Sequence, residues 1–110
     1  MRNLLVLAAA IGILAFGALH PLASSGAAPN VAHGKTIFAQ NCAACHGADG
    51  TGGVGPTLHG ALKTPAMPRT QTALVAWVKN PKAPMPKLFP SPLKEQDVQD
   101  VAAYVLATFK

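Results

Sequence analysis

Apolar residues at helical spacing mark the first element that the chain predicts. Val31, Gly34, Phe38 and Cys42 recur at intervals typical of one helix face, and Asn30 precedes them in the position of a helix N-cap. A glycine inside a helix costs about 1 kcal/mol relative to alanine. We therefore expect Gly34 to lie on the packing face, where it lets another backbone come close.

Two later segments show the same periodicity. The stretch TALVAWVK predicts a short helix over residues 72–79, and Pro81 ends it because the residue before a proline avoids helical geometry. The last predicted helix covers about residues 94–108, with Ser91 and Pro92 offering an earlier start. Its apolar stripe is flanked by Tyr104 and consists of Val98, Val101, Ala102, Val105 and Phe109.

The segments between these helices are predicted to be loops. Residues 46–60 contain six glycines and a proline, and residues 61–69 continue the loop with two more prolines. Residues 81–92 contain five prolines, which force most of that segment to run extended. It also holds Met85, Leu88 and Phe89, so we expect a rigid strap laid over a hydrophobic object. Without strand alternation or repeats, the pattern predicts an all-α fold with three main helices and long loops.

The N-terminus has the three parts of a secretory signal peptide. Arg2 precedes the uncharged run Leu4 to Leu19, and small residues follow it up to Ala28. We expect a leader over residues 1–28 and a folded domain over residues 29–110. The alternative is an uncleaved membrane anchor, although the apolar run is shorter than the roughly 20 residues that a spanning helix needs.

The small size of the domain calls for a stabilising cross-link or cofactor. Chains this short rarely bury enough apolar surface by themselves. Two cysteines are present, but they are three positions apart, so a disulfide between them would close almost no loop. A large bound cofactor would serve better, because its apolar body would complete the core.

Cys42, Cys45 and His46 form the C-x-x-C-H pattern of covalent haem attachment. At the end of a helix the two thiols reach one edge of the porphyrin, and His46 falls beneath the iron as its proximal ligand. Three other uses of this motif fit the sequence less well. A dithiol oxidoreductase needs a preceding strand, a zinc site would have to recruit His33 or His59 in an unusual spacing, and a plain disulfide would constrain little.

The second axial position has several candidates. Met67 and Met85 each precede a proline, and His33 and His59 are the other candidates. Met85 lies in the proline strap, which would hold it rigidly and place Leu88 and Phe89 around its sulfur. These residues alone leave the choice open.

Together these features resemble the class I cytochrome c family over about residues 29–110. The resemblance implies one haem wrapped by the helices and a near-perpendicular crossing of the first and last helices. One departure is Lys94, which stands where the family often has a Ser or Thr N-cap. The residues that carry the resemblance are Gly34, Phe38, Cys42-Ala43-Ala44-Cys45-His46, Gly55-Pro56-Thr57-Leu58, Trp77, Met85-Pro86 and Ala102-Ala103-Tyr104.

The resemblance also implies roles for individual residues. The carbonyl of Pro56 would accept a hydrogen bond from Nδ1 of His46 and fix its tautomer. Leu58 would line the haem pocket, and Trp77 would lie near a haem propionate. Met85 would be the distal iron ligand. A closed His/Met site suits electron transfer rather than oxygen chemistry, and the thioether favours a relatively high potential.

The function predicted is therefore one-electron transfer by a carrier of a single haem c, not enzymatic catalysis. The nearest alternative is a dedicated cytochrome subunit of a dehydrogenase or oxidase complex. A haem sensor or peroxidase-like enzyme, with Met85 displaced by ligand, is a second alternative. No acid–base pair or activated nucleophile is evident in the sequence.

The charge distribution indicates the kind of partner. The net charge is +5, and most basic residues fall between positions 63 and 94. A basic face would steer redox proteins with an acidic docking surface. Nucleic acid is not expected, membrane contact is expected only through a retained leader, and the domain is expected to be a monomer in the periplasm. The basic residues of this stretch are Lys63, Arg69, Lys79, Lys82, Lys87 and Lys94.

Overall fold

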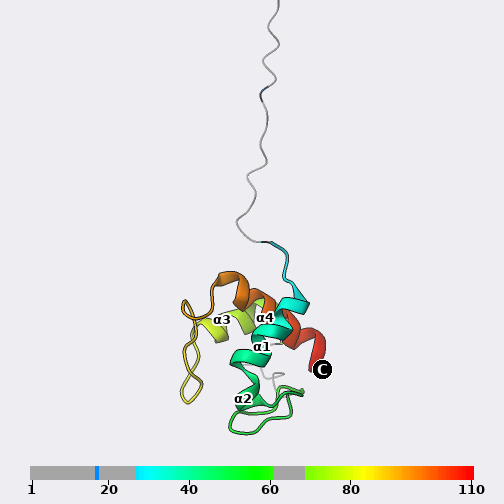
Figure 1. Cartoon of the computed structure of the whole chain (residues 1–110), viewed down its shortest axis with the longest axis vertical. Helices are drawn as coiled ribbons and strands as arrows, with labels where there is room; N and C mark the ends of the chain where they lie inside the picture. The colour runs from blue at the N-terminus through cyan, green and yellow to red at the C-terminus, as the bar shows by residue number, and fades with distance from the viewer. Residues whose placement is uncertain (1–16, 18–26, 61–68) are drawn as a thin grey trace, which may run out of the picture.

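A computed structural model of the chain describes residues 17, 27–60 and 69–110. Within these residues every regular element is a helix, so the all-α prediction is confirmed (Figure 1). A short helix that carries the haem motif adds to the three expected helices. The helices are α1 (Val31–Asn41), α2 (Ala43–His46), α3 (Gln71–Lys79) and α4 (Glu95–Thr108).

Helix α1 packs against α4 through its glycine, as expected. A Cβ at Gly34 would lie 2.0 Å from the backbone oxygen of Asp100, so only glycine permits this approach. The Asn30 side chain caps the helix by accepting the backbone N–H of His33 at 3.0 Å. The expected apolar face is wrong at Val31, which is 42% exposed. Ile37 is buried instead, because it follows Gly34 by three residues and so lies on the same face of the helix.

Helix α3 begins one residue before the predicted boundary. Thr70 is its N-cap, and its side-chain oxygen accepts the backbone N–H of Ala73 at 3.2 Å. The helix ends at Lys79, with Asn80 as its C-cap before Pro81, as the sequence predicts. Leu74 and Val75 are buried where α3 packs against α4.

Helix α4 starts after Lys94, and the alternative start at Ser91 and Pro92 is wrong. Leu93 is 2% exposed and its N–H donates to the carbonyl of Leu88 at 2.9 Å, so the chain is still turning into the core there. Lys94 supplies no capping side chain; instead the carboxylate of Asp97 accepts the backbone N–H of Lys94 at 2.9 Å. An acid in the first turn also favours the helix dipole.

The core lies along α4, against which both α1 and α3 pack. The ring of Phe38 is 5.5 Å from that of Tyr104 and 5.1 Å from that of Phe109, in tilted arrangements that suit aromatic pairs. In Figure 1 the segment 81–92 and the part of the chain that contains α2 both extend away from this helical layer. Leu88 and Phe89 tie the former segment to the core, against which they are partly buried.

Several sequence predictions fall outside the described residues. The expected leader, residues 1–28, lies almost entirely there, as do Lys63 and Met67. Within the part of the chain that the structure describes, no helix has the length and apolarity needed to cross a membrane.

Candidate functional site

Two adjoining cavities form one cleft between α1, α3, α4 and the loops. Their volumes are about 130 and 310 Å³. Apart from His46, every side chain that lines the smaller cavity is apolar or carries sulfur. The residues that line both cavities, and so make the cleft continuous, are Cys42, His46, Pro56, Trp77, Val78 and Met85.

The short helix α2 presents the C-x-x-C-H residues to this cleft. Cys42 ends α1 with its N–H on the carbonyl of Phe38, and its own carbonyl accepts the N–H groups of Cys45 and His46 at 3.2 and 3.0 Å. This tight turn places Cys42 and His46 at the smaller cavity and Cys45 at the larger one. Burial, and then the neighbouring Cys45, raise the pKa of the Cys42 thiol to about 11, so this thiol is protonated near neutral pH.

His46 is held in one orientation by the glycine-rich loop. Its Nδ1 is 2.9 Å from the carbonyl oxygen of Pro56, as the resemblance to the class I cytochrome c family implies. A carbonyl can only accept, so Nδ1 carries the proton and Nε2 keeps its lone pair. Gly55 makes this contact possible, because a Cβ there would lie 3.0 Å from the His46 ring. Its N–H in turn donates to the carbonyl of Cys45 at 2.8 Å.

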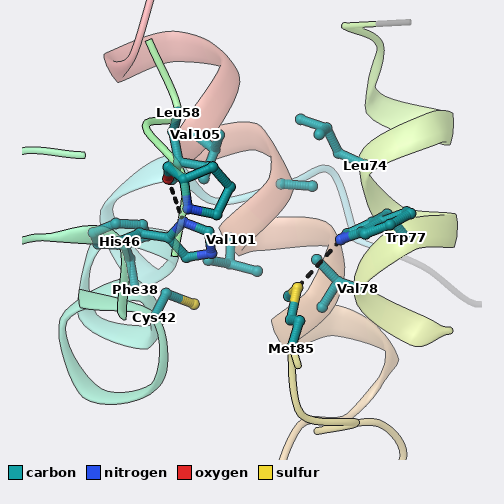
Figure 2. Close-up of a pocket in the computed structure, with 12 residues that line it drawn as sticks. Phe38, Cys42, His46, Leu58, Leu74, Trp77, Val78, Met85, Val101 and Val105 are labelled. Carbon is teal, nitrogen blue, oxygen red and sulfur yellow. Dashed lines mark hydrogen bonds between the residues drawn. The ribbon is translucent and has the colours of Figure 1, made fainter. Parts of the chain in front are cut away.

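Met85 reaches the same cleft from the segment between α3 and α4. Figure 2 shows its sulfur next to the indole of Trp77, whose Nε1 donates a hydrogen bond to Sδ at 3.2 Å. The backbone N–H of Met85 donates to the carbonyl of Lys82 at 3.1 Å, which closes a turn around the methionine. The indole N–H, expected to face a haem propionate, is therefore directed at the methionine sulfur in this structure.

The structure thus brings all seven predicted site residues to one cleft. Leu58 lines its smaller cavity, beside Phe38. Leu88 lines the larger cavity together with Met85, in agreement with its expected place near the methionine sulfur. The same expectation is wrong for Phe89, which lines neither cavity and packs under the ammonium of Lys79 instead. Of the other proposed ligands, His33 pairs with Asp100 and His59 bonds the carbonyl of Asp49, so neither side chain is directed at the cleft.

The sequence did not predict the remaining lining residues as part of the site, only as apolar residues of helices. Leu74 and Val78 come from α3, and Val101, Ala102 and Val105 come from α4. The three from α4 belong to the apolar stripe that predicted that helix. Their helical period shows that they face inward, but it does not distinguish a packed neighbour from a cofactor.

The chemistry of this cleft fits a covalently bound haem. Two thiols stand at one edge for attachment, and an imidazole with a free Nε2 and a thioether sulfur enter the same apolar space. Imidazole and thioether are the axial donors of electron-transfer haems. The wall is apolar, as the porphyrin face requires. Among the described residues no group of three or more His, Cys, Asp or Glu side chains is placed to bind a metal ion by itself.

Fold and site together define a small class I c-type cytochrome. Residues 29–105 match the family model described as cytochrome C oxidase, cbb3-type, subunit III, and the chain belongs to this family of cytochromes. It is also similar to cytochrome c6 of Synechocystis, with 38% identity over 96 residues that cover 86% of this chain and 78% of the relative. Cytochrome c6 of Cyanidioschyzon merolae is 41% identical over 87 residues, covering 76% of this chain and 79% of the relative.

Solved structures agree with these relatives. Cytochrome c6 from the diatom Phaeodactylum tricornutum superposes with a TM-score of 0.64 at 38% identity, over 71% of this chain and 92% of that one. The match to the oxidase subunit CcoP of Cereibacter sphaeroides is 44% identical but covers only 26% of that subunit. The chain is therefore a small one-haem electron carrier with covalently bound haem c, not an enzyme, and it exchanges electrons with partner proteins.

Proposed function

We propose that this carrier attaches its haem through Cys42 and Cys45 and ligates the iron with His46 and Met85. The observation that carries this proposal is the convergence of all four side chains on one apolar cleft. Pro56 and Trp77 would act on the two ligands, and Leu58 would line the pocket. When bound, the haem supplies one reversible electron at its iron.

His46 is prepared for its role by the Pro56 carbonyl. The hydrogen bond at Nδ1 selects the tautomer with a free Nε2 and makes the imidazole a stronger donor. Gly55 lets the loop backbone lie close against the ring, since a Cβ there would be 3.0 Å from it. A fixed ligand keeps the reorganisation that accompanies each electron small.

Met85 would complete the coordination and keep external ligands out. Its sulfur is directed by Trp77 and its backbone by the turn from Lys82. A thioether favours the reduced iron, so the protein would work as an acceptor of relatively high potential. A coordination sphere closed in this way supports electron transfer and opposes sensor or peroxidase chemistry.

We further propose that the redox partners carry an acidic docking surface. The segment 81–92 next to the cleft has two lysines and no acid, and both lysines are exposed. Lys82 lines the larger cavity, and Val54, which is 84% exposed, lies on the same cavity. An apolar contact ringed by positive charge suits a transient redox encounter. Lys82→Glu and Lys87→Glu should each slow electron transfer to an acidic partner at low salt, and high salt should abolish the difference.

The proposed place of work is the periplasm. The leader pattern of residues 1–28 supports export, and haem attachment to a C-x-x-C-H motif is compatible with it. We propose cleavage before the domain at residues 29–110, which would act as a monomer without nucleic acid or membrane contact. The intact mass of denatured protein, produced with periplasmic haem maturation, tests attachment and cleavage together. A mass without haem would overturn the proposal, whereas a full-length mass with haem would indicate a retained anchor.

Met85→Ala tests the axial ligand. It should abolish the methionine-to-iron charge-transfer band of the oxidised protein and allow cyanide or carbon monoxide to bind rapidly. The matched variant Met67→Ala should leave the spectrum unchanged. The reverse result would assign the ligand to Met67.

A further inference from the structure

One ion pair joins the two helix ends between which the segment 81–92, which carries Met85, is held. Lys79, in the last turn of α3, forms an ion pair with Glu95, in the first turn of α4. These two residues bracket the whole connection between α3 and α4. Each charge also stands at the helix end whose dipole favours it, a cation at the C-terminus and an anion at the N-terminus.

The same ammonium group contacts the returning limb of the segment, residues 86–92, which follow Met85. Nζ of Lys79 lies 4.9 Å from the ring centroid of Phe89, within the range of a cation–π interaction. Phe89 is partly buried against the core, and the side chain of Lys79 is only 29% exposed. The lysine therefore bridges three parts of the chain: α3, the returning limb of the segment and α4.

Other hydrogen bonds of the segment are few and local. The turn from Lys82 shapes the backbone at Met85, and the bond from Leu93 to Leu88 closes the far end. Nζ of Lys94 also donates to the carbonyl of Pro90 at 3.2 Å, but this contact is exposed to solvent. Trp77 holds the sulfur itself. Only one residue separates Trp77 from Lys79 on α3, so one short helix holds both Met85 and the returning limb of the segment.

We propose that Lys79 is a positioning residue for Met85, which it keeps on the iron by fastening the returning limb of the segment through Phe89 and Glu95. This inference rests on the proposed axial ligation by Met85. Lys79 lines neither cavity of the cleft, so it would act on Met85 only through the segment. It lowers the frequency with which the segment lifts and takes the thioether away from the metal.

The expected effect is a change in ligand exchange rather than in fold. An exposed cation–π contact and a surface ion pair are each individually weak. Losing both should raise the rate of Met85 displacement from the oxidised protein by about three- to tenfold. The reduced protein should respond less, because reduced iron binds a thioether more firmly.

Stopped-flow displacement of Met85 by imidazole provides the measurement, followed through the methionine-to-iron charge-transfer band. Lys79→Met keeps the length and apolar stem of the side chain but removes the charge, so it should raise the limiting rate. Lys79→Arg keeps both the ion pair and the cation over Phe89, so it should restore the rate to within about twofold of the original protein. Lys35→Met, at an exposed site on α1, makes the same charge change and should have no effect.

Phe89→Leu separates the cation–π contact from the ion pair. In that background Lys79→Met should raise the rate less than it does in the original protein, because one of its two contacts is already gone. Asn30→Ala removes a helix cap far from the segment and serves as a variant of lowered global stability. Equal acceleration by Asn30→Ala would show that Lys79 acts only through overall stability, and would overturn the inference.

The outcomes distinguish this inference from the proposed function. If Met85→Ala leaves the spectrum and imidazole kinetics unchanged, the axial ligation itself fails. If Met85→Ala opens the iron but Lys79→Met behaves like Lys35→Met, only the positioning role of Lys79 is overturned. Acceleration by Lys79→Met with rescue by Lys79→Arg supports it.

Discussion

The indole Nε1 of Trp77 donates a hydrogen bond to Sδ of Met85 at 3.2 Å. Both side chains line the two cavities of the cleft, so the contact lies inside the apolar site. A hydrogen bond to a thioether withdraws electron density from the sulfur, and it is a weak bond because sulfur is a weak acceptor. Trp77 would therefore tune the donor strength of the proposed distal ligand.

Trp77→Phe should lower the reduction potential. The phenyl ring keeps most of the packing, whereas loss of the N–H makes the sulfur a stronger donor that stabilises oxidised iron. A net hydrogen bond of about 0.5–1 kcal/mol corresponds to roughly 20–40 mV for one electron. Protein-film voltammetry would measure the change.

The same variant tests the sequence prediction that Trp77 faces a haem propionate. Removing a bond to the methionine should shift the methionine-to-iron charge-transfer band. Removing a bond to a propionate should leave that band in place and alter the pH dependence of the potential instead. An unchanged band would therefore contradict the geometry seen here.

The position of Trp77 in sequence predicted that it faces the site, but not which group its N–H meets. The C-x-x-C-H motif and the helical period predicted the cleft because covalent spacing and backbone geometry determine both. The partner of an indole N–H, or the stacking of Phe89 under Lys79, depends on how a proline-rich segment folds back. That path is decided by tertiary packing, which no local pattern encodes.

Gly34 is the residue whose packing role the sequence predicted most directly. A Cβ there would lie 2.0 Å from the backbone oxygen of Asp100 and 2.8 Å from Cβ of Tyr104. Gly34→Ala should lower the free energy of unfolding by about 2 kcal/mol or more, since α1 and α4 must separate despite the better helix propensity of alanine. Denaturant unfolding of the haem-loaded protein would measure this change.

Ala32→Gly provides the matched control on the exposed side of α1. It makes the opposite replacement and should cost about 1 kcal/mol through propensity alone. If Gly34→Ala were as stable as the original protein, the close contact between α1 and α4 would be wrong.

Arg69 has a structural role that the sequence did not reveal. The sequence predicted it only as one of the basic residues of a docking face. Its guanidinium donates to the carbonyls of Leu58 and Val105, each at 3.2 Å, and also to that of Phe109. It thereby satisfies the carbonyl end of α4, where intrahelical donors are missing. A side chain that reaches the C-terminal end of α4 and a distant loop acts as a structural bridge rather than as part of a docking face.

Arg69→Lys should lower the free energy of unfolding by about 2 kcal/mol, although the charge is kept. A single ammonium cannot reproduce a planar fork that serves several carbonyls at once. Thermal unfolding would measure the loss, with Lys35→Arg as the control for exchange between the two cations. Equal stability of Arg69→Lys and the original protein would show that these contacts contribute only through charge.

Asp100 makes the junction of α1 and α4 sensitive to acid. Burial of this carboxylate opposes its ionisation, but hydrogen bonds from the backbone N–H of Asn30, from His33 and from Gln96 outweigh burial and lower its pKa below the ordinary value of 3.8. Oδ1 of Asp100 lies 2.8 Å from the backbone nitrogen of Asn30 and 2.9 Å from Nε2 of Gln96, and Oδ2 lies 2.7 Å from Nδ1 of His33. His33 Nε2 also lies 3.9 Å from Asp97.

Because folding lowers this pKa, the unfolded chain binds the proton more readily than the folded one. The stabilisation from ionised Asp100 is therefore fully present above about pH 5 and is lost as the pH falls through 3.8 toward the folded pKa. Asp100→Asn should be less stable than the original protein at pH 6, and the difference should shrink below pH 4. Denaturant unfolding of both proteins across pH 3–7 would measure it. A difference that stays constant over this range would show that Asp100 acts without its charge, through hydrogen bonding that the asparagine loses at every pH.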